Sequence, residues 1–322
     1  METRPERVRP TLFVPGHLPT LDNWRLALLR EGLTLERGSL NGSGLASPIE
    51  VEWIHNPGDG SFGQAFSFGT VSESEQSVID TASGALVLSL HADLHTARVP
   101  ISALIRALAH CGGLAVRIEE SKVGFTIARW LELVDASDLY HAAVMALCGK
   151  SEATSCGMHA FSLPDASVAI DEETDMAEAQ RLLAAINRYQ IDEDPLLLSG
   201  QRFSPDAESP KRVLRRWPDA GYPEGHACHN PFGIWRVGTA GSRGQPPDNL
   251  AFVFMPALVV SLLHAEQRCG QPLTREQVAE ITESGHCVAM DHRDAQKFER
   301  QRGYADLDPE LAWEQWQVYC RR

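Results

Sequence analysis

Hydrophobic and polar positions alternate in recognisable ways over the first 60 residues of the chain. Residues 10–14 predict a strand, and Thr20 caps a helix that keeps one apolar face until Gly32 ends it. Residues 33–37 and 49–54 predict two more strands, and charged side chains occupy one face of the second. The fold therefore opens with a strand–helix unit, and one face of strand 49–54 is expected to remain in water.

The pattern that follows extends this sheet. Residues 65–71 predict a further strand and residues 75–83 a helix. The continuous apolar run at 85–90 is typical of a central strand, and the helical spacing over 101–108 leads to a strand at 114–118. This order of elements favours an α+β fold, in which helices pack on an open mixed sheet with ferredoxin-like elements.

Helical and strand-like patterns continue to about residue 240. Helices are predicted at 127–134, 138–147 and 176–189, a strand-like segment at 154–165, and short strands around Leu196, Val213 and Ile234. The stretch at 238–248 is rich in Gly, Ser and Pro, and is the best candidate for a linker. We therefore expect an α+β domain over 10–240 and a second unit over 250–322.

The second unit has a helical pattern. Pro256 suits the first turn of a helix, Thr274 and Gln277 form a capping box, and Asp308 with Pro309 begins a last helix. The longest apolar run, at 250–263, is shorter than the roughly twenty residues that a membrane span needs. We expect a small module of about four helices and no membrane association.

Composition and net charge limit the classes of molecule that the protein is expected to bind. The 322 residues are 43% hydrophobic, enough for a large core, and carry a net charge of −14 with a pI near 5.3. Such a surface repels nucleic acids and anionic lipids. The seven cysteines are scattered and odd in number, and no signal-peptide pattern follows Met1. The chain is expected to be cytoplasmic and bacterial in type, with reduced thiols.

The known catalytic and cofactor motifs are absent from the sequence, so no cofactor is predicted. Cys156 and His159 invite a nucleophile-and-base hypothesis, but on a strand an offset of three places them on opposite faces. A packed thiol and a hydrogen-bonded histidine are the alternative. Asp165, which follows Leu163 and Pro164, is either a functional carboxylate or a residue that shapes a turn.

A second candidate cluster lies at 226–229. His226, Cys228 and His229 are suitable zinc ligands, but their spacing is not that of a zinc finger and no fourth ligand is evident. Loop histidines in contact with water are the alternative. We therefore predict no metal site, while these three residues remain the candidates for one.

Charge gives a stronger signal than any motif. Between Asp165 and Glu208 there are eleven acidic residues and three arginines, and Asp171, Glu172 and Glu173 are consecutive. A solvated helix face is one explanation; a surface that binds a basic protein is the other. Trp313 and Trp316 share one side of the last helix, where they either dock onto the first domain or anchor a partner.

One family resemblance rests on the order of elements and on short motifs. These are the strand 85–90, Trp130, the run Thr154-x-x-Gly157-Met158-His159-x-Phe161-x-Leu163-Pro164-Asp165, and the turn at 195–200. Over residues 10–240 the chain resembles the bacterial domain-of-unknown-function family 4261. The C-terminal part, with its Gly303 to Glu310 run, resembles the tails of other bacterial proteins of unknown function. Neither resemblance implies a reaction.

These observations favour a binding or accessory protein over an enzyme, such as an immunity or secretion-associated factor. Its binding residues would be drawn from Asp171, Glu172, Glu173, Trp313, Trp316, His159 and Asp165, and its partner would be a basic protein. The alternative is a hydrolase that uses His159, Asp165 or the cluster at 226–229. The sequence does not determine an oligomeric state.

Overall fold

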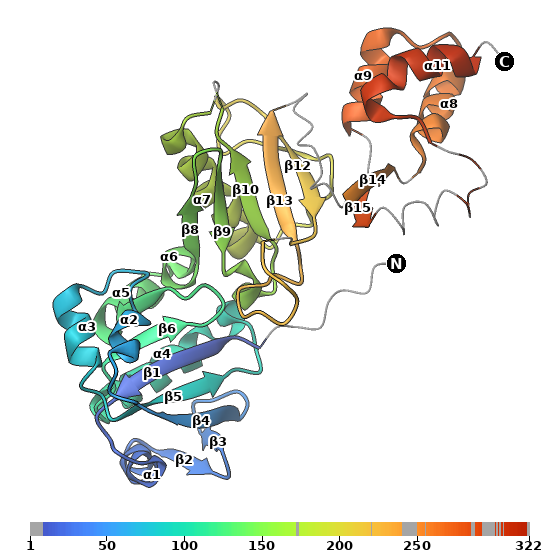
Figure 1. The fold of residues 1–322 in the computed structure, drawn as a ribbon. Helices are drawn as coiled ribbons and strands as arrows, with labels where there is room; N and C mark the ends of the chain where they lie inside the picture. The colour runs from blue at the N-terminus through green and yellow to red at the C-terminus, as the bar shows by residue number, and fades with distance from the viewer. Residues whose placement is uncertain are drawn as a thin grey trace.

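The protein combines helices with two sheets and a separate pair of strands (Figure 1). The computed structural model describes residues 9–171, 174–219, 221–239, 250–254, 256–284, 287–291, 300, 302, 304 and 306–320. The predicted α+β class is confirmed. The strands of 10–240 are divided between a seven-stranded and a six-stranded sheet, where the sequence had predicted a single one.

The first sheet is antiparallel throughout. Its strands are β1 (Thr11–Gly16), β2 (Leu33–Glu36), β3 (Ser39–Gly42), β4 (Ile49–His55), β5 (Gly84–Ser89), β6 (Ala115–Ile118) and β7 (Gly124–Thr126). Their order in space is β2-β3-β4-β5-β1-β6-β7. The central position of β1 and β5 agrees with their apolar sequences, because central strands are covered on both faces.

Helices cover the two faces of this sheet unequally. The helices are α1 (Leu21–Arg30), α2 (Ser61–Gln64), α3 (Glu73–Ile79), α4 (Leu94–His110) and α5 (Ile127–Asp135). Leu12 and Val14 point into the main core with α1, α4 and α5, while Phe13 points to the other face and packs against Phe62 and Phe66 of the α2–α3 segment. That second face is only partly covered, and its open part forms one wall of the site described below.

The second sheet is mixed, because β10 and β13 run parallel while the other pairs are antiparallel. Its strands are β8 (Met145–Cys148), β9 (Glu152–Cys156), β10 (Asp165–Ala169), β11 (Arg202–Phe203), β12 (Arg212–Trp217) and β13 (Ile234–Thr239), in the order β11-β12-β13-β10-β9-β8. Helix α7 (Met176–Glu193) covers one face, with Leu182, Leu183 and Ile186 buried against Trp235. The other face borders a cavity lined by polar side chains, such as Ser167 and Arg236, and by apolar ones, such as Trp217 and Ile234.

The two sheets share a core at their junction. The short helix α6 (Leu139–Ala143) and the 3₁₀ turn η1 (Met158–Phe161) place Met158, Ala160 and Phe161 in the same hydrophobic cluster as α4 and α5. Met158 and Ala160 are fully buried. This shared packing fixes one sheet against the other, so residues from both can build a common site.

Several predicted elements differ from the structure. Residues 65–71 lack the predicted strand, and β3 forms where a loop was expected. Residues 138–147 are divided into α6 and β8. The segment 154–165 breaks at Gly157, whose φ is +115°; a Cβ there would lie 2.7 Å from Ser121 Cβ. Only glycine tolerates both conditions, so β9 ends and the chain turns through η1 into β10.

The described residues of the C-terminal part form three α-helices, where about four were predicted, together with two strands that the sequence pattern had not indicated. The elements are β14 (Leu250–Phe254), α8 (Leu258–Cys269), α9 (Arg275–Ser284), β15 (Cys287–Asp291), η2 (Pro309–Leu311) and α11 (Ala312–Cys320). The capping box is present, with Thr274 and Gln277 exchanging hydrogen bonds of 2.9 and 3.3 Å. Most of the predicted linker, residues 240–249, lies outside the described residues. In the described part of the chain, no helix is long and apolar enough to cross a bilayer.

Candidate functional site: a cleft between the two sheets

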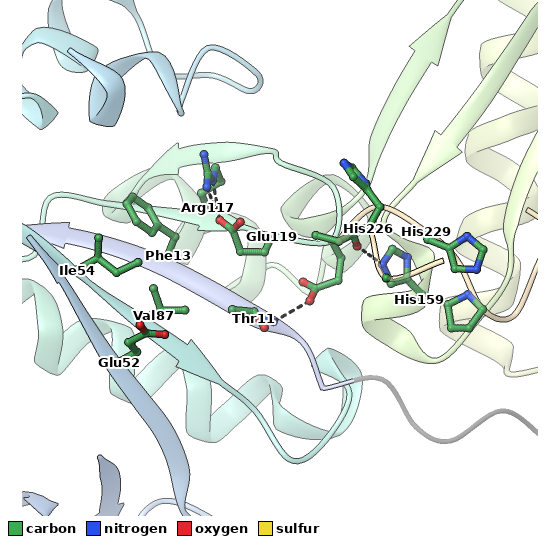
Figure 2. A pocket seen from close by; sticks show the side chains of 14 residues that line it. Thr11, Phe13, Glu52, Ile54, Val87, Arg117, Glu119, His159, His226 and His229 are labelled. Atoms are coloured by element: carbon green, nitrogen blue, oxygen red, sulfur yellow. Dashed lines mark hydrogen bonds and ion pairs between the residues drawn. The ribbon is translucent and has the colours of Figure 1, made fainter. Parts of the chain in front are cut away.

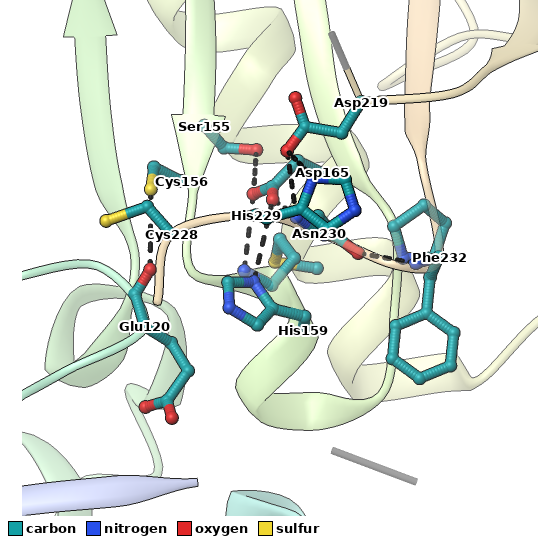
Figure 3. A network of polar contacts seen from close by, with 12 residues as sticks. Glu120, Ser155, Cys156, His159, Asp165, Asp219, Cys228, His229, Asn230 and Phe232 are labelled. Carbon is teal, nitrogen blue, oxygen red and sulfur yellow. Dashed lines mark hydrogen bonds and ion pairs between the residues drawn. The ribbon is translucent and has the colours of Figure 1, made fainter. Parts of the chain in front are cut away.

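The loop that joins β12 to β13 lies at the junction of the two sheets (Figure 3). It carries Asp219, His226, Cys228, His229 and Asn230. The turn after β9 approaches it from the other side with Cys156, His159 and Asp165. The two candidate clusters of the sequence, which are about 70 residues apart in the chain, are therefore neighbours in the fold.

Asp165 is the anchor of this junction. Its Oδ1 accepts hydrogen bonds from Ser155 Oγ (2.9 Å) and the Met158 amide (3.2 Å), and its Oδ2 accepts one from Asn230 Nδ2 (2.6 Å). Asn230 Nδ2 also donates to the carbonyl of Leu163. Asp165 thus ties β9, η1 and the β12–β13 loop together. It shapes a turn, as one hypothesis predicted, and its side chain is buried.

Burial controls ionisation in this network. It raises the pKa of Asp165 to about 7, although the three hydrogen bonds favour the charged form. Burial also lowers the pKa of His159, so its imidazole is neutral at pH 7. His159 Nε2 donates to the Ala227 carbonyl (2.9 Å), and Nδ1 lies 4.0 Å from Asp165 Oδ2. The imidazole therefore braces the loop.

The sequence argument against a Cys156–His159 pair treated the segment as one continuous strand, and the segment is not one. Cys156 ends β9, whereas His159 lies on the turn η1. The Cys156 thiol donates to the Glu120 carbonyl (3.4 Å) and is hydrogen-bonded to Cys228, and burial adds to the rise in its pKa. A raised pKa disfavours the thiolate that a hydrolytic nucleophile needs.

The three candidate zinc ligands make separate contacts. His226 stacks on Tyr222 with ring centroids 4.9 Å apart, and its Nδ1 accepts the amide of Cys228. His229 Nδ1 donates to the Tyr222 carbonyl (2.9 Å) and lies 3.6 Å from Asp219 Oδ2. No group of three or more His, Cys, Asp or Glu side chains suited to a metal occurs among the residues that the structure describes.

A cavity of about 650 Å³ opens between this loop and the uncovered face of the first sheet (Figure 2). Phe13, Ile54 and Val87 give the sheet side an apolar surface. His159, His226 and His229 are grouped on the side of the loop. A volume of this size suits a small ligand or a short segment of a partner protein. We refer to this cavity as the cleft.

Acidic groups outnumber arginine in the cleft. Glu52, Glu119, Glu120 and Arg117 all line it. Arg117 binds Glu119 at 2.6 Å and lies over the ring of Phe13, while Lys122 Nζ is 2.5 Å from the other oxygen of Glu119. Glu119 is thus neutralised by two cations, whereas Glu52 and Glu120 form no ion pair with another described residue.

Glu120 is the most unusual of these groups. It lies in the turn between β6 and β7, only 5% exposed, and its Oε1 accepts the Thr11 amide at 2.9 Å. Its Oε2 is buried and has no hydrogen-bond partner among the described residues. Burial raises the pKa of Glu120 to about 8. A buried polar atom without a partner costs free energy, so its presence at a cavity wall points to a ligand.

The remaining sequence candidates lie away from the cleft. Asp171 is exposed and accepts the Thr174 amide in a turn before α7, while Glu172 and Glu173 lie outside the described residues. Trp316 is 1% exposed in the core of the C-terminal helices, and Trp313 packs against the same core. The hypothesis that these two indoles form an exposed anchor is therefore wrong.

Sequence reasoning overlooked Glu120, Asn230 and Asp219. Asp219 accepts the Asn230 amide at 2.8 Å and so shapes the loop. Nothing in the local sequence distinguishes these residues from ordinary polar loop positions.

Comparisons with known proteins do not assign the site. No family model matches the chain, and no curated protein or solved structure matches it either. The resemblance to family 4261 stays a prediction. The function must therefore be argued from the cleft itself.

Proposed function

We propose that this chain is a cytosolic bacterial binding protein, whose cleft between the two sheets receives a basic side chain of a partner protein. The observation that carries the proposal is the buried carboxyl of Glu120, which lines the cleft with one oxygen unpartnered among the described residues. A guanidinium or ammonium group supplies the donors that this oxygen lacks.

The rest of the cleft supports the same kind of ligand. Phe13, Ile54 and Val87 offer an apolar surface for the methylene groups of an arginine or lysine, whose stems pack on apolar atoms. Glu52 adds an exposed carboxylate at the same sheet face. The net charge of −14 favours encounter with a basic partner.

Preorganisation supports binding. The loop wall of the cleft is held by Asp165 through Asn230 and by His159 through the Ala227 carbonyl. These contacts give Asp165 and His159 bracing roles, which favours the binding hypothesis over a hydrolase that uses the same two residues. The six cysteines whose side chains are described are free thiols, in keeping with a reducing compartment.

We predict that the protein retains arginine-containing tripeptides selectively. The probes are a pool of acetyl-Xaa-Arg-Xaa-amide peptides with apolar Xaa, and a matched pool with neutral citrulline in place of arginine. At pH 8.5 we expect the protein to retain about ten times more of the arginine pool than of the citrulline pool in equilibrium dialysis. A charge-assisted hydrogen bond contributes enough binding free energy for a difference of this size. The replacement Glu120→Gln should abolish most of this preference.

The matched control is Glu36→Gln, which removes an exposed carboxylate of β2 that does not line the cleft. It should leave the preference unchanged. Equal retention of the two pools by the wild-type protein, or a preference that survives Glu120→Gln, contradicts the proposal.

A further inference from the structure

Two cysteines meet beside the cleft, in a position that the proposed binding function does not use. Cys156 ends β9, and Cys228 belongs to the β12–β13 loop. Their side chains are 2% and 4% exposed, and a hydrogen bond joins the two thiols. Figure 3 shows both sulfur atoms on the same side of the junction, close to Glu120.

The surroundings of the pair differ from those of a cysteine that only fills space. A second cavity, of about 360 Å³, is lined by Cys156 and Cys228 together with Asp165, Asp219, Trp217 and Tyr222. A cysteine in a hydrophobic core has apolar neighbours and no open space beside it. Here the two cysteines border open space.

We propose that Cys156 and Cys228 form a redox-active dithiol that a hydroperoxide oxidises to a disulfide. In the first step the Cys228 thiolate attacks one peroxide oxygen and the O–O bond breaks. Cys228 becomes a sulfenic acid, and the departing hydroxide takes up a proton to form water. In the second step the Cys156 sulfur attacks the Cys228 sulfur and the S–O bond breaks. The hydroxide that leaves takes the Cys156 proton, giving a second water.

The roles of the two sulfurs follow from their contact with each other. The hydrogen bond between them lowers the pKa of Cys228 and, together with burial, raises that of Cys156. Cys228 is therefore the sulfur that attacks the peroxide, and Cys156 is the one that resolves the sulfenic acid. The disulfide would join β9 covalently to the loop that carries His226 and His229.

The test uses the full chain with Cys148, Cys269 and Cys320, whose side chains are exposed, replaced by serine to prevent cross-linking between molecules. One equivalent of hydrogen peroxide should remove two of the four remaining thiols per chain. Peptide mapping without reductant should recover Cys156 linked to Cys228, and dithiothreitol should restore both thiols.

Two further variants give the controls. With Cys228→Ser, Cys156 should remain a free thiol after the same treatment. With Cys111→Ser, which removes a cysteine outside the pair, the link should form as before. Recovery of Cys156 and Cys228 as free thiols after peroxide treatment of the parent protein overturns the proposal. So does a Cys228 that oxidises to sulfinic acid without linking to Cys156.

Discussion

Replacing Asp165 with alanine should lower the free energy of unfolding by about 3–5 kcal/mol, the range expected when a buried, multiply hydrogen-bonded group is lost. The substitution removes the acceptor for the Ser155 hydroxyl, the Met158 amide and the Asn230 side chain. Those buried donors would then lack a partner. Urea unfolding followed by fluorescence measures the loss.

Two comparisons make this result specific. Asp192→Ala removes an exposed carboxylate near the end of α7 and should change the unfolding free energy by less than about 0.5 kcal/mol. The double variant Asp165→Asn, Asn230→Asp again places a hydrogen-bond donor opposite an acceptor. It should recover part of the unfolding free energy that Asp165→Asn alone loses. An Asp165→Ala protein as stable as wild type contradicts the anchoring role.

The second large effect concerns Glu120 and pH. Its folded-state pKa of about 8 is higher than the ordinary 4.5, because burial penalises the charged form. The folded protein therefore binds more protons than the unfolded chain between these values. Stability contributed by this group is full below about pH 4.5, falls as pH rises, and is lost above pH 8.

Glu120→Gln removes this dependence while keeping an acceptor for the Thr11 amide. We expect the variant to exceed wild type in unfolding free energy by about 2–5 kcal/mol at pH 9, and by less than about 1 kcal/mol at pH 4.5. The matched control is Glu36→Gln. An equal difference between Glu120→Gln and wild type at the two pH values contradicts the inferred burial of an uncompensated carboxyl.

Other groups near Glu120 also titrate, and their effects on the pH dependence of stability must be distinguished from that of Glu120. Glu119 and Lys122 flank it in the same turn, and Cys156 donates to its backbone carbonyl. Glu52, Arg117, His159, His226 and His229 line the cleft with it. These groups are present in both proteins, so the difference between wild type and Glu120→Gln isolates the contribution of Glu120.

Much of the first sheet could be predicted from local sequence. β1, β5 and the helix capped by Thr20 follow from periodicity and capping, which act within a few residues. The break at Gly157 was missed because the flanking residues have a strand pattern, although a glycine within such a run is itself a warning. The break lets β10 turn back and pair antiparallel with β9 inside the second sheet.

The site could not be predicted in the same way. Asp165 meets Asn230, and Cys156 meets Cys228, only because β10 pairs in parallel with β13 and brings the preceding loop back over η1. No local pattern encodes such a contact. The burial of Glu120 similarly depends on how its turn meets the start of β1. The sequence allowed candidate residues to be chosen by their chemistry, but the residues that they contact could be identified only from the three-dimensional structure.

The most direct test of the cleft as a cation site is the number of protons released when an arginine peptide binds. At pH 7 the free Glu120 carboxyl is mostly protonated, and a bound guanidinium should force its ionisation. Calorimetry with the best-retained arginine tripeptide, in buffers of different ionisation enthalpy, should show release of about one proton per chain by wild type and almost none by Glu120→Gln. Binding without proton release by wild type, or equal release by both proteins, would show that the cation does not bind at Glu120.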